Sequence, residues 1–115
     1  MAAILQAASG AERSESIGIL GAPTPGATVA ITISTGAKTF KWTAGEDETV
    51  NISGTQLAGQ EITCQILDSG TRTITFGTGF KAAATVVGVN GKTATVTFRS
   101  DGTNFYEIGR AVEIT

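Results

Sequence analysis

Apolar and polar residues alternate with a period of two along six segments of the chain after residue 26. Each segment therefore has one apolar face and one face rich in threonine, a β-branched residue that suits an exposed pleated surface. Strands with one face in water are typical of antiparallel sheets. The six segments are residues 28–33, 38–42, 49–53, 61–66, 71–76 and 93–98.

Turn-forming stretches such as AGEDE and SDGT separate these segments, and no sustained helical period occurs between residues 27 and 115. Turns at this spacing are those of a sandwich or barrel. The pattern predicts an all-β fold, a compact antiparallel β-sandwich or jelly-roll-like barrel of about eight or nine short strands with an extended N-terminal arm.

One hairpin is predicted at the Asn90-Gly91 pair, which is a strong signal for a type I′ turn. A two-residue loop at this pair would place Val87 opposite Ala94. Val87 is then expected to face the core, and Val86 is expected to face outward.

A second hairpin is predicted within residues 97–110, TFRSDGTNFYEIGR. A two-residue loop would place Glu107 opposite Val96 in the core, whereas a three-residue loop places Tyr106 there. A slip of one residue moves every side chain to the other face of a strand. Because only the three-residue loop spares the core a carboxylate, we expect Tyr106 inside and Phe105 outside.

The N-terminal part of the chain differs from the rest, because residues 1–26 show no sustained period and contain both prolines. We interpret residues 1–26 as an arm and residues 27–115 as the β-domain. The alternative is a frayed terminus. Apolar side chains in an arm without a core of its own need a partner surface, as do outward apolar residues of the β-domain. The expected protein-contact residues are Ile17, Ile19, Leu20, Val86 and Phe105.

Composition excludes several classes of function. The net charge is −2 without a cluster of Lys or Arg, so we expect neither nucleic acid nor a membrane surface as partner. The chain has no histidine and one cysteine, which removes Ser–His and Cys–His catalytic pairs. No apolar run approaches the ~20 residues of a membrane span. The N-terminus does not resemble a signal peptide, and we expect synthesis in a cytoplasm.

Acidic residues are the remaining candidates for chemistry. Gly45–Glu48 gathers three acids but lacks the ligand order of a calcium loop, so we expect a solvated loop. Nothing places two of Asp68, Asp101 and Glu107 at a working distance for acid–base catalysis. We therefore predict no catalytic residues, no metal and no cofactor, and we do not expect an enzyme.

Two longer motifs carry a resemblance. The stretch GTRTITFG (Gly70–Gly77) precedes a variable middle, and FRSDGTNFYE (Phe98–Glu107) follows it. Together they resemble a small β-module of tailed-bacteriophage structural proteins. The weaker match of residues 49–67 extends the resemblance to about residues 27–110. The resemblance implies a virion structural protein, and the family has no catalytic residues to transfer.

Such modules occur on tail fibres and spikes and as small head decoration (cement) proteins. One β-domain with an arm, taken as a complete polypeptide, fits a decoration protein better than a fibre. We therefore expect a protein on the outer surface of the virion head that stabilises the shell by bridging subunits of the major capsid protein. The resemblance also implies a homotrimer. The alternatives are a tail fibre, baseplate or receptor- or carbohydrate-binding tail component, and a cellular binding domain.

Overall fold

The computed structural model describes residues 20–115, so the expected contact residues Ile17 and Ile19 lie outside the described part. This part is all-β, with a single 3-10 turn, η2 (Ile33–Thr35), and it has no helix able to cross a membrane. The strands are β2 (Leu20–Gly21), β3 (Thr28–Thr32), β4 (Thr39–Ala44), β5 (Glu48–Ser53), β6 (Glu61–Asp68), β7 (Thr73–Phe76), β8 (Phe80–Lys81), β9 (Val86–Val87), β10 (Thr93–Ser100) and β11 (Phe105–Ile114).

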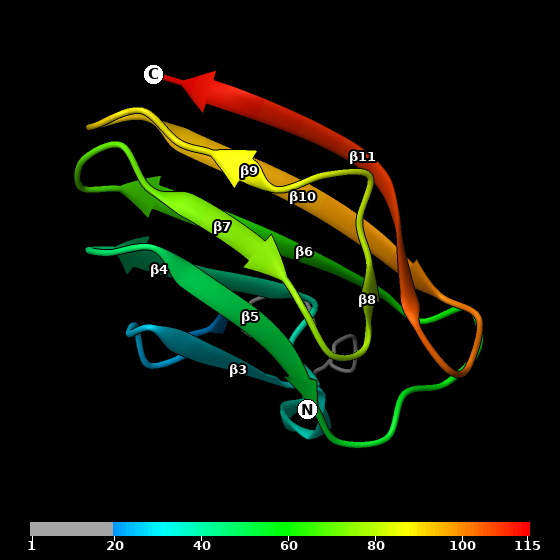
Figure 1. Ribbon diagram of the computed structural model, residues 1–115. Coiled ribbons are helices and arrows are strands. Elements are labelled where there is room, and N and C mark those ends of the chain that lie inside the picture. The colour runs from blue at the N-terminus through cyan, green and yellow to red at the C-terminus, as the bar shows by residue number, and fades with distance from the viewer. Residues whose placement is uncertain (1–19) are drawn as a thin grey trace, which may run out of the picture.

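The strands form two sheets that lie one in front of the other (Figure 1). One sheet has six strands in the order β2-β4-β6-β10-β11-β8, and the other has four in the order β3-β5-β7-β9. From β3 to β7 the chain changes sheet after every strand. Each strand therefore pairs with the strand two positions along the sequence, as the turns of a coil do.

This coil corrects the antiparallel part of the fold prediction. Among the described strands, the parallel pairs are β3–β5, β5–β7, β4–β6, β2–β4 and β8–β11. The antiparallel pairs are β6–β10, β10–β11 and β7–β9. The period-two pattern determines which face of a strand is exposed to solvent. It is the same whether the neighbouring strand runs parallel or antiparallel. The loops decide the direction, because they cross between the sheets instead of closing hairpins. The all-β, compact character is confirmed, and the arrangement is a mixed, solenoid-like one.

The core lies between the two sheets and contains the inward side chains of every long strand. One end of the core contains a cluster of four phenylalanines, Phe76 of β7, Phe80 of β8, Phe98 of β10 and Phe105 of β11. Ring centroids of Phe80 and Phe98 are 4.7 Å apart, and those of Phe80 and Phe105 are 6.4 Å apart. Cys64 is buried in β6, as its alternating segment predicts, and burial raises the pKa of its thiol.

The predicted hairpin at Asn90-Gly91 is wrong. Val86 pairs with Ile74 of β7 in the four-stranded sheet, so Val86 is 1% exposed and Val87 is 56% exposed. A turn does occur, because the Lys92 N–H donates to the Val89 carbonyl at 3.0 Å. Gly91 has a positive φ of 78° and Asn90 does not, so the turn lacks the two left-handed residues of type I′. The chain crosses to the other sheet there, and the predicted faces of both valines are reversed.

The predicted register of the second hairpin is also wrong. Ser100 pairs with Phe105 across a four-residue turn, residues 101–104, in which the Asp101 N–H donates to the Asn104 carbonyl at 3.1 Å. The Phe105 side chain is fully buried, whereas Tyr106 is 46% exposed. The interpretation of Asp101 as a turn residue is confirmed, because its Oδ1 accepts the N–H groups of residues 103 and 104, each at 2.9 Å.

The predicted register of β11 is wrong because Glu107 can lie at the border of the core. The register puts Glu107 opposite Phe98, on the face that the sequence prediction kept free of carboxylates. Its carboxylate accepts a hydrogen bond from the Ala83 N–H at 3.0 Å and forms an ion pair with Arg110. A charge that is paired and hydrogen-bonded at the border of a core costs far less than an isolated one.

Part of the predicted arm belongs to the six-stranded sheet. Leu20 and Gly21 form β2, which runs parallel to β4 with Leu20 opposite Thr39. Further along, the Gly26 N–H donates to Glu48 at 3.4 Å. The expected contact residue Leu20 is 56% exposed, so its side chain is available to a partner.

The register of β11 predicts opposite effects for its two aromatic residues. Phe105→Ala removes a fully buried ring and should lower the free energy of unfolding by about 3–5 kcal/mol. Tyr106→Ala removes a half-exposed ring and should lower it by less than about 1 kcal/mol. Urea unfolding followed by tryptophan fluorescence measures both. Equal costs, or a larger cost at Tyr106, would contradict this register.

Candidate functional site

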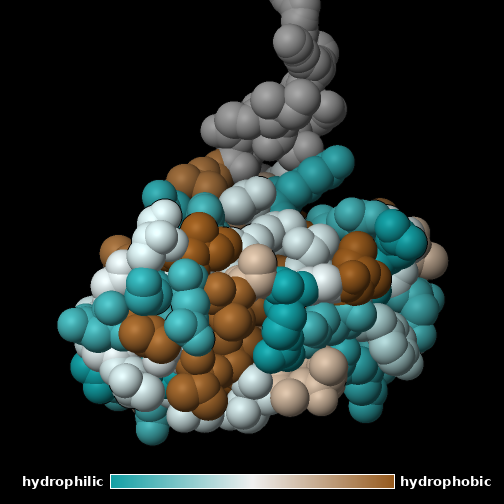
Figure 2. Space-filling view, turned by 90° about the horizontal axis from the view of Figure 1, so that it is seen from above, coloured by the Kyte–Doolittle hydropathy of each residue, from teal (hydrophilic) through white to brown (hydrophobic). Residues whose placement is uncertain are grey.

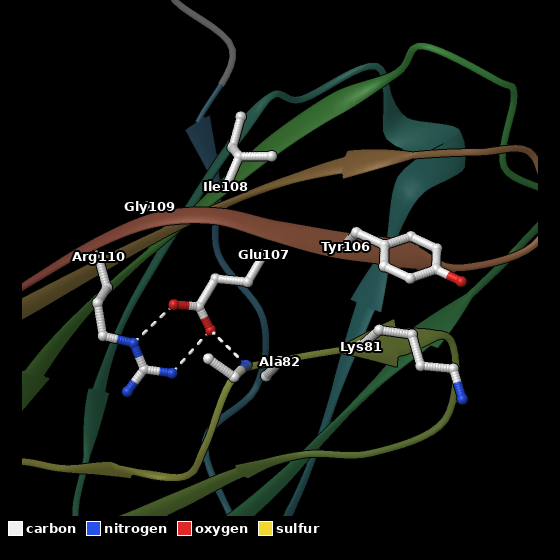
Figure 3. Close-up of a pocket in the computed structure, with 8 residues that line it drawn as sticks. Lys81, Ala82, Tyr106, Glu107, Ile108, Gly109 and Arg110 are labelled. Carbon is white, nitrogen blue, oxygen red and sulfur yellow. Dashed lines mark hydrogen bonds and ion pairs between the residues drawn. The ribbon is translucent and has the colours of Figure 1, made fainter.

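The junction of β8 and β11 forms an open groove at one edge of the six-stranded sheet. Residues 105 and 106 of β11 pair in parallel with Phe80 and Lys81 of β8, and the Phe105 N–H donates to the Gly79 carbonyl at 2.7 Å. After Lys81 the chain turns away from β11. The opening has a volume of about 630 Å³ and is lined by residues 81–83 and 106–110 (Figure 3).

An ion pair holds the inner wall of this groove. Glu107 accepts hydrogen bonds from Arg110 Nε and Nη2, both at 2.7 Å, and from the Ala83 N–H. Arg110 also donates to the carbonyls of Thr85 at 3.1 Å and Ala84 at 2.9 Å. The bond to Arg110 holds the pKa of Glu107 below its usual range, and Glu107 raises the pKa of Arg110. Both groups are therefore ionised, and they fasten residues 83–85 to β11 rather than act as a free acid or base.

The outer part of the groove has a different character. Figure 3 shows Tyr106 and Lys81 side by side, pointing away from the Glu107–Arg110 pair. Tyr106 is the exposed aromatic residue of the described part of the chain, since the rings of Trp42 and of the phenylalanines are buried. An exposed ring next to an ammonium group offers one apolar surface and hydrogen-bond donors to a polar ligand.

The contact residues expected from the sequence do not gather into one surface. Val86 and Phe105 are buried, so neither can contact a partner. Leu20 lies on β2, at the edge of the six-stranded sheet opposite to that of β11 and β8.

The sequence prediction missed exposed apolar residues on β9 and β11, of which Ile108 lines this groove. They are Val87 of β9 and Ile108, Val112 and Ile114 of β11. The signal was present in YEIGRAVEIT, where apolar residues continue beyond the last core position of β11.

A second cluster of titratable groups is buried between the sheets. Glu48 and Asp68 are 2% and 1% exposed, although Glu48 was expected in a solvated loop. The Trp42 Nε1–H donates to Glu48 Oε1 at 2.8 Å, whereas Asp68 Oδ1 has no partner. A Cβ added to Gly88 would collide with the Asp68 carboxyl group, so this position requires glycine.

Burial is the main reason that the pKa values of Glu48 and Asp68 are raised. The nearby charge of Glu48 raises the pKa of Asp68 further, and Arg72 opposes that shift. The negative charge of Glu48 therefore favours the protonated form of Asp68. Glu48 accepts hydrogen bonds from the Trp42 Nε1–H and the Gly26 N–H, and these favour its ionised form. Asp68 lacks such a partner at Oδ1, so its protonated form is favoured. No group of three or more metal-ligating side chains occurs within residues 20–115.

The acid pair predicts a dependence of stability on pH. A raised pKa means that the folded state binds a proton more tightly than the unfolded state, so stability falls as pH rises through the folded-state pKa. Asp68→Asn should raise the melting temperature near pH 8 by on the order of 5 °C and flatten its decline with pH. Thermal scans between pH 4 and pH 8 measure this. The control is Asp47→Asn, which changes an exposed residue; an equal effect of both variants would contradict the assignment.

The two segments that carry the phage resemblance have structural roles here. Ile74, Phe76, Phe98 and Phe105 are in the core, and Asp101 closes the turn between β10 and β11. Comparison with family models, with curated proteins and with solved structures found no match to this chain.

Proposed function

We propose that this protein is a structural component of a tailed-phage virion, a decoration (cement) protein on the outer surface of the head. The observation that carries the proposal is that the core-forming residues and the exposed apolar residues occupy different positions along the chain. The motif residues that resemble phage modules build the core and a turn, while exposed apolar side chains lie on other positions of β9 and β11. A scaffold with an exposed apolar surface is suited to binding protein rather than to catalysis.

The proposed partner is the major capsid protein, and the proposed effect is to bridge its subunits. Leu20 offers an exposed apolar side chain at the β2 edge, and Ile17 and Ile19 precede it in the sequence. Docking of these three side chains would contribute roughly 1.5–3 kcal/mol each before ordering costs are subtracted. In a homotrimer the contact is made three times, and linked weak contacts raise avidity by roughly 10²–10⁴.

A tail component that binds carbohydrate is the second candidate, and Tyr106 favours it. The ring is exposed in an open groove beside Lys81, which is an arrangement able to stack on a sugar and donate hydrogen bonds to it. Titration with host surface glycans separates the two candidates. Binding that is lost in Tyr106→Ala would favour the tail, whereas binding to shells without glycan binding would favour the head.

The decoration function predicts binding to undecorated, expanded phage heads. The full chain should bind such shells saturably and raise their melting temperature. A full-length variant with Ile17→Ser, Ile19→Ser and Leu20→Ser should bind at least about tenfold more weakly, because a loss of 1.4 kcal/mol is already tenfold. Co-sedimentation with shells measures both affinities.

Leu57→Ser is the matched control, since Leu57 is 70% exposed in the loop before β6. This variant should bind shells as the unchanged chain does. Absence of binding by the unchanged chain would contradict the decoration function. Equal binding by the triple variant would contradict the contact by residues 17–20 alone.

A further inference from the structure

Strand β11 leaves the core after its first residue. It has ten residues, of which Phe105 is buried, Glu107 is half-buried, and the others are exposed. It nevertheless remains paired with β10 as far as Ile114, which lies opposite Thr93. We call Ile108–Ile114 the free segment of β11.

The outer edge of the free segment has no neighbouring strand in the described part of the chain. Strand β8 covers only residues 105 and 106, and residues 83–85 reach β11 through side chains of Glu107 and Arg110. An edge of this kind presents unpaired backbone groups, and soluble proteins usually protect it with lysine, proline or a covering element. The free segment contains neither lysine nor proline. It carries two irregularities of register, one beside Ile108 and one near Glu113, which has a positive φ of 58°.

Apolar side chains accompany this open edge. Ile108, Val112 and Ile114 are 50%, 42% and 42% exposed. Figure 2 is a view from the side on which β11 lies in Figure 1, and it shows hydrophobic patches among hydrophilic areas on this side of the molecule. Figure 3 shows Ile108 on the opposite side of β11 from the Glu107–Arg110 pair. Ile108 therefore lies on the side of β11 away from this ion pair, and Val112 and Ile114 are exposed further along the same strand.

The charges near the free segment decide what kind of partner fits. Among the residues that line the groove or belong to the free segment, the charged ones are Lys81, Glu107, Arg110 and Glu113, and Glu107 is paired with Arg110. Two acids and two bases leave no net charge. A neutral apolar surface does not repel its own copy, whereas a nucleic acid or a strongly charged protein would find no complementary charge there. A strand edge without a paired neighbour, next to exposed apolar side chains, is a feature that closed symmetric assemblies can cover.

We propose that copies of this chain contact one another through the free segment of β11, around the axis of a closed homo-oligomer. In this assembly Val112 and Ile114 of each copy pack against the free segment of another copy, and Ile108 extends the contact toward the groove. Under the proposed function, on which the number of three copies rests, the oligomer is a trimer. The β2 edge, at the other side of the same sheet, then stays free for the capsid.

The test compares the mass in solution of the full chain with that of a double variant, Val112→Glu with Ile114→Glu. The unchanged chain should form an oligomer, three times the 11.7 kDa of one chain if it is a trimer, at micromolar concentration. The double variant should be monomeric, with a dissociation constant raised at least about 100-fold and an unchanged far-UV spectrum. Leu57→Glu, which makes the same kind of change at a 70% exposed position near the β10–β11 turn and so at the opposite end of β10 from Ile114, should remain oligomeric. Sedimentation equilibrium measures all three.

Cross-linking gives a second readout that does not depend on introduced charge. Under mild oxidation, Val112→Cys or Ile114→Cys should form a disulfide between copies, because Cys64 is buried and leaves the new thiol as the reactive one. Leu57→Cys should remain reduced at the same protein concentration. Cross-linking of Leu57→Cys but of neither β11 variant would overturn the proposal.

The outcomes separate this inference from the proposed function. A monomeric unchanged chain, or a double variant that stays oligomeric, would overturn the β11 contact whatever the binding to shells. An oligomer that the double variant dissociates, but that binds no shell, would support the β11 contact and contradict the decoration function. A monomeric double variant that still binds shells, with lower avidity, would support both.

Discussion

Burial of Phe105 against Phe80, which in turn packs on Phe98, fixes the register of β11, and the positions of the following side chains depend on it. With Phe105 inside, Tyr106 must point outward next to Lys81, because successive side chains of a strand alternate. Glu107 then returns to the inner side, where it meets the Ala83 N–H and Arg110. A ring whose burial is worth several kcal/mol outweighs the cost of one paired carboxylate at the border of the core.

The connections between strands are the second constraint. Loops that cross from one sheet to the other make neighbouring strands parallel, and they bring Glu48 at the start of β5 near Asp68 at the end of β6. The same crossing takes β9 away from β10 and turns Val86 inward. The buried acid pair and the reversed valines therefore have one origin, the coiled path of the chain. Gly88 lies on this path and leaves room for the Asp68 carboxyl group.

The sequence predicts the faces of strands better than their partners. Residues such as Ile31, Cys64 and Phe98 are buried as their alternation predicts, because period two depends only on the local pleat. Strand direction, the partner of Val86 and the length of the turn at Asp101 depend on contacts between distant segments, which no short window contains. At the candidate site, Leu20 is exposed as expected, but Phe105 was misplaced because a carboxylate was assumed to be intolerable beside Phe98. Ile108 and Val112 were not identified as exposed because the sequence pattern does not show where β11 leaves the core.

The order of strands in the six-stranded sheet has a consequence for folding kinetics. Strands β10 and β11 are the one pair of sequence neighbours that also pair in the described sheets, and a four-residue turn joins them. Every other pairing must first close a longer loop, and mainly non-local pairing places small β-proteins in the range of milliseconds to seconds. The β10–β11 hairpin can therefore form earliest, although it is synthesised after the other described strands. During synthesis on a ribosome, the edge of β6 that pairs with β10 would stay unpaired until β10 has emerged.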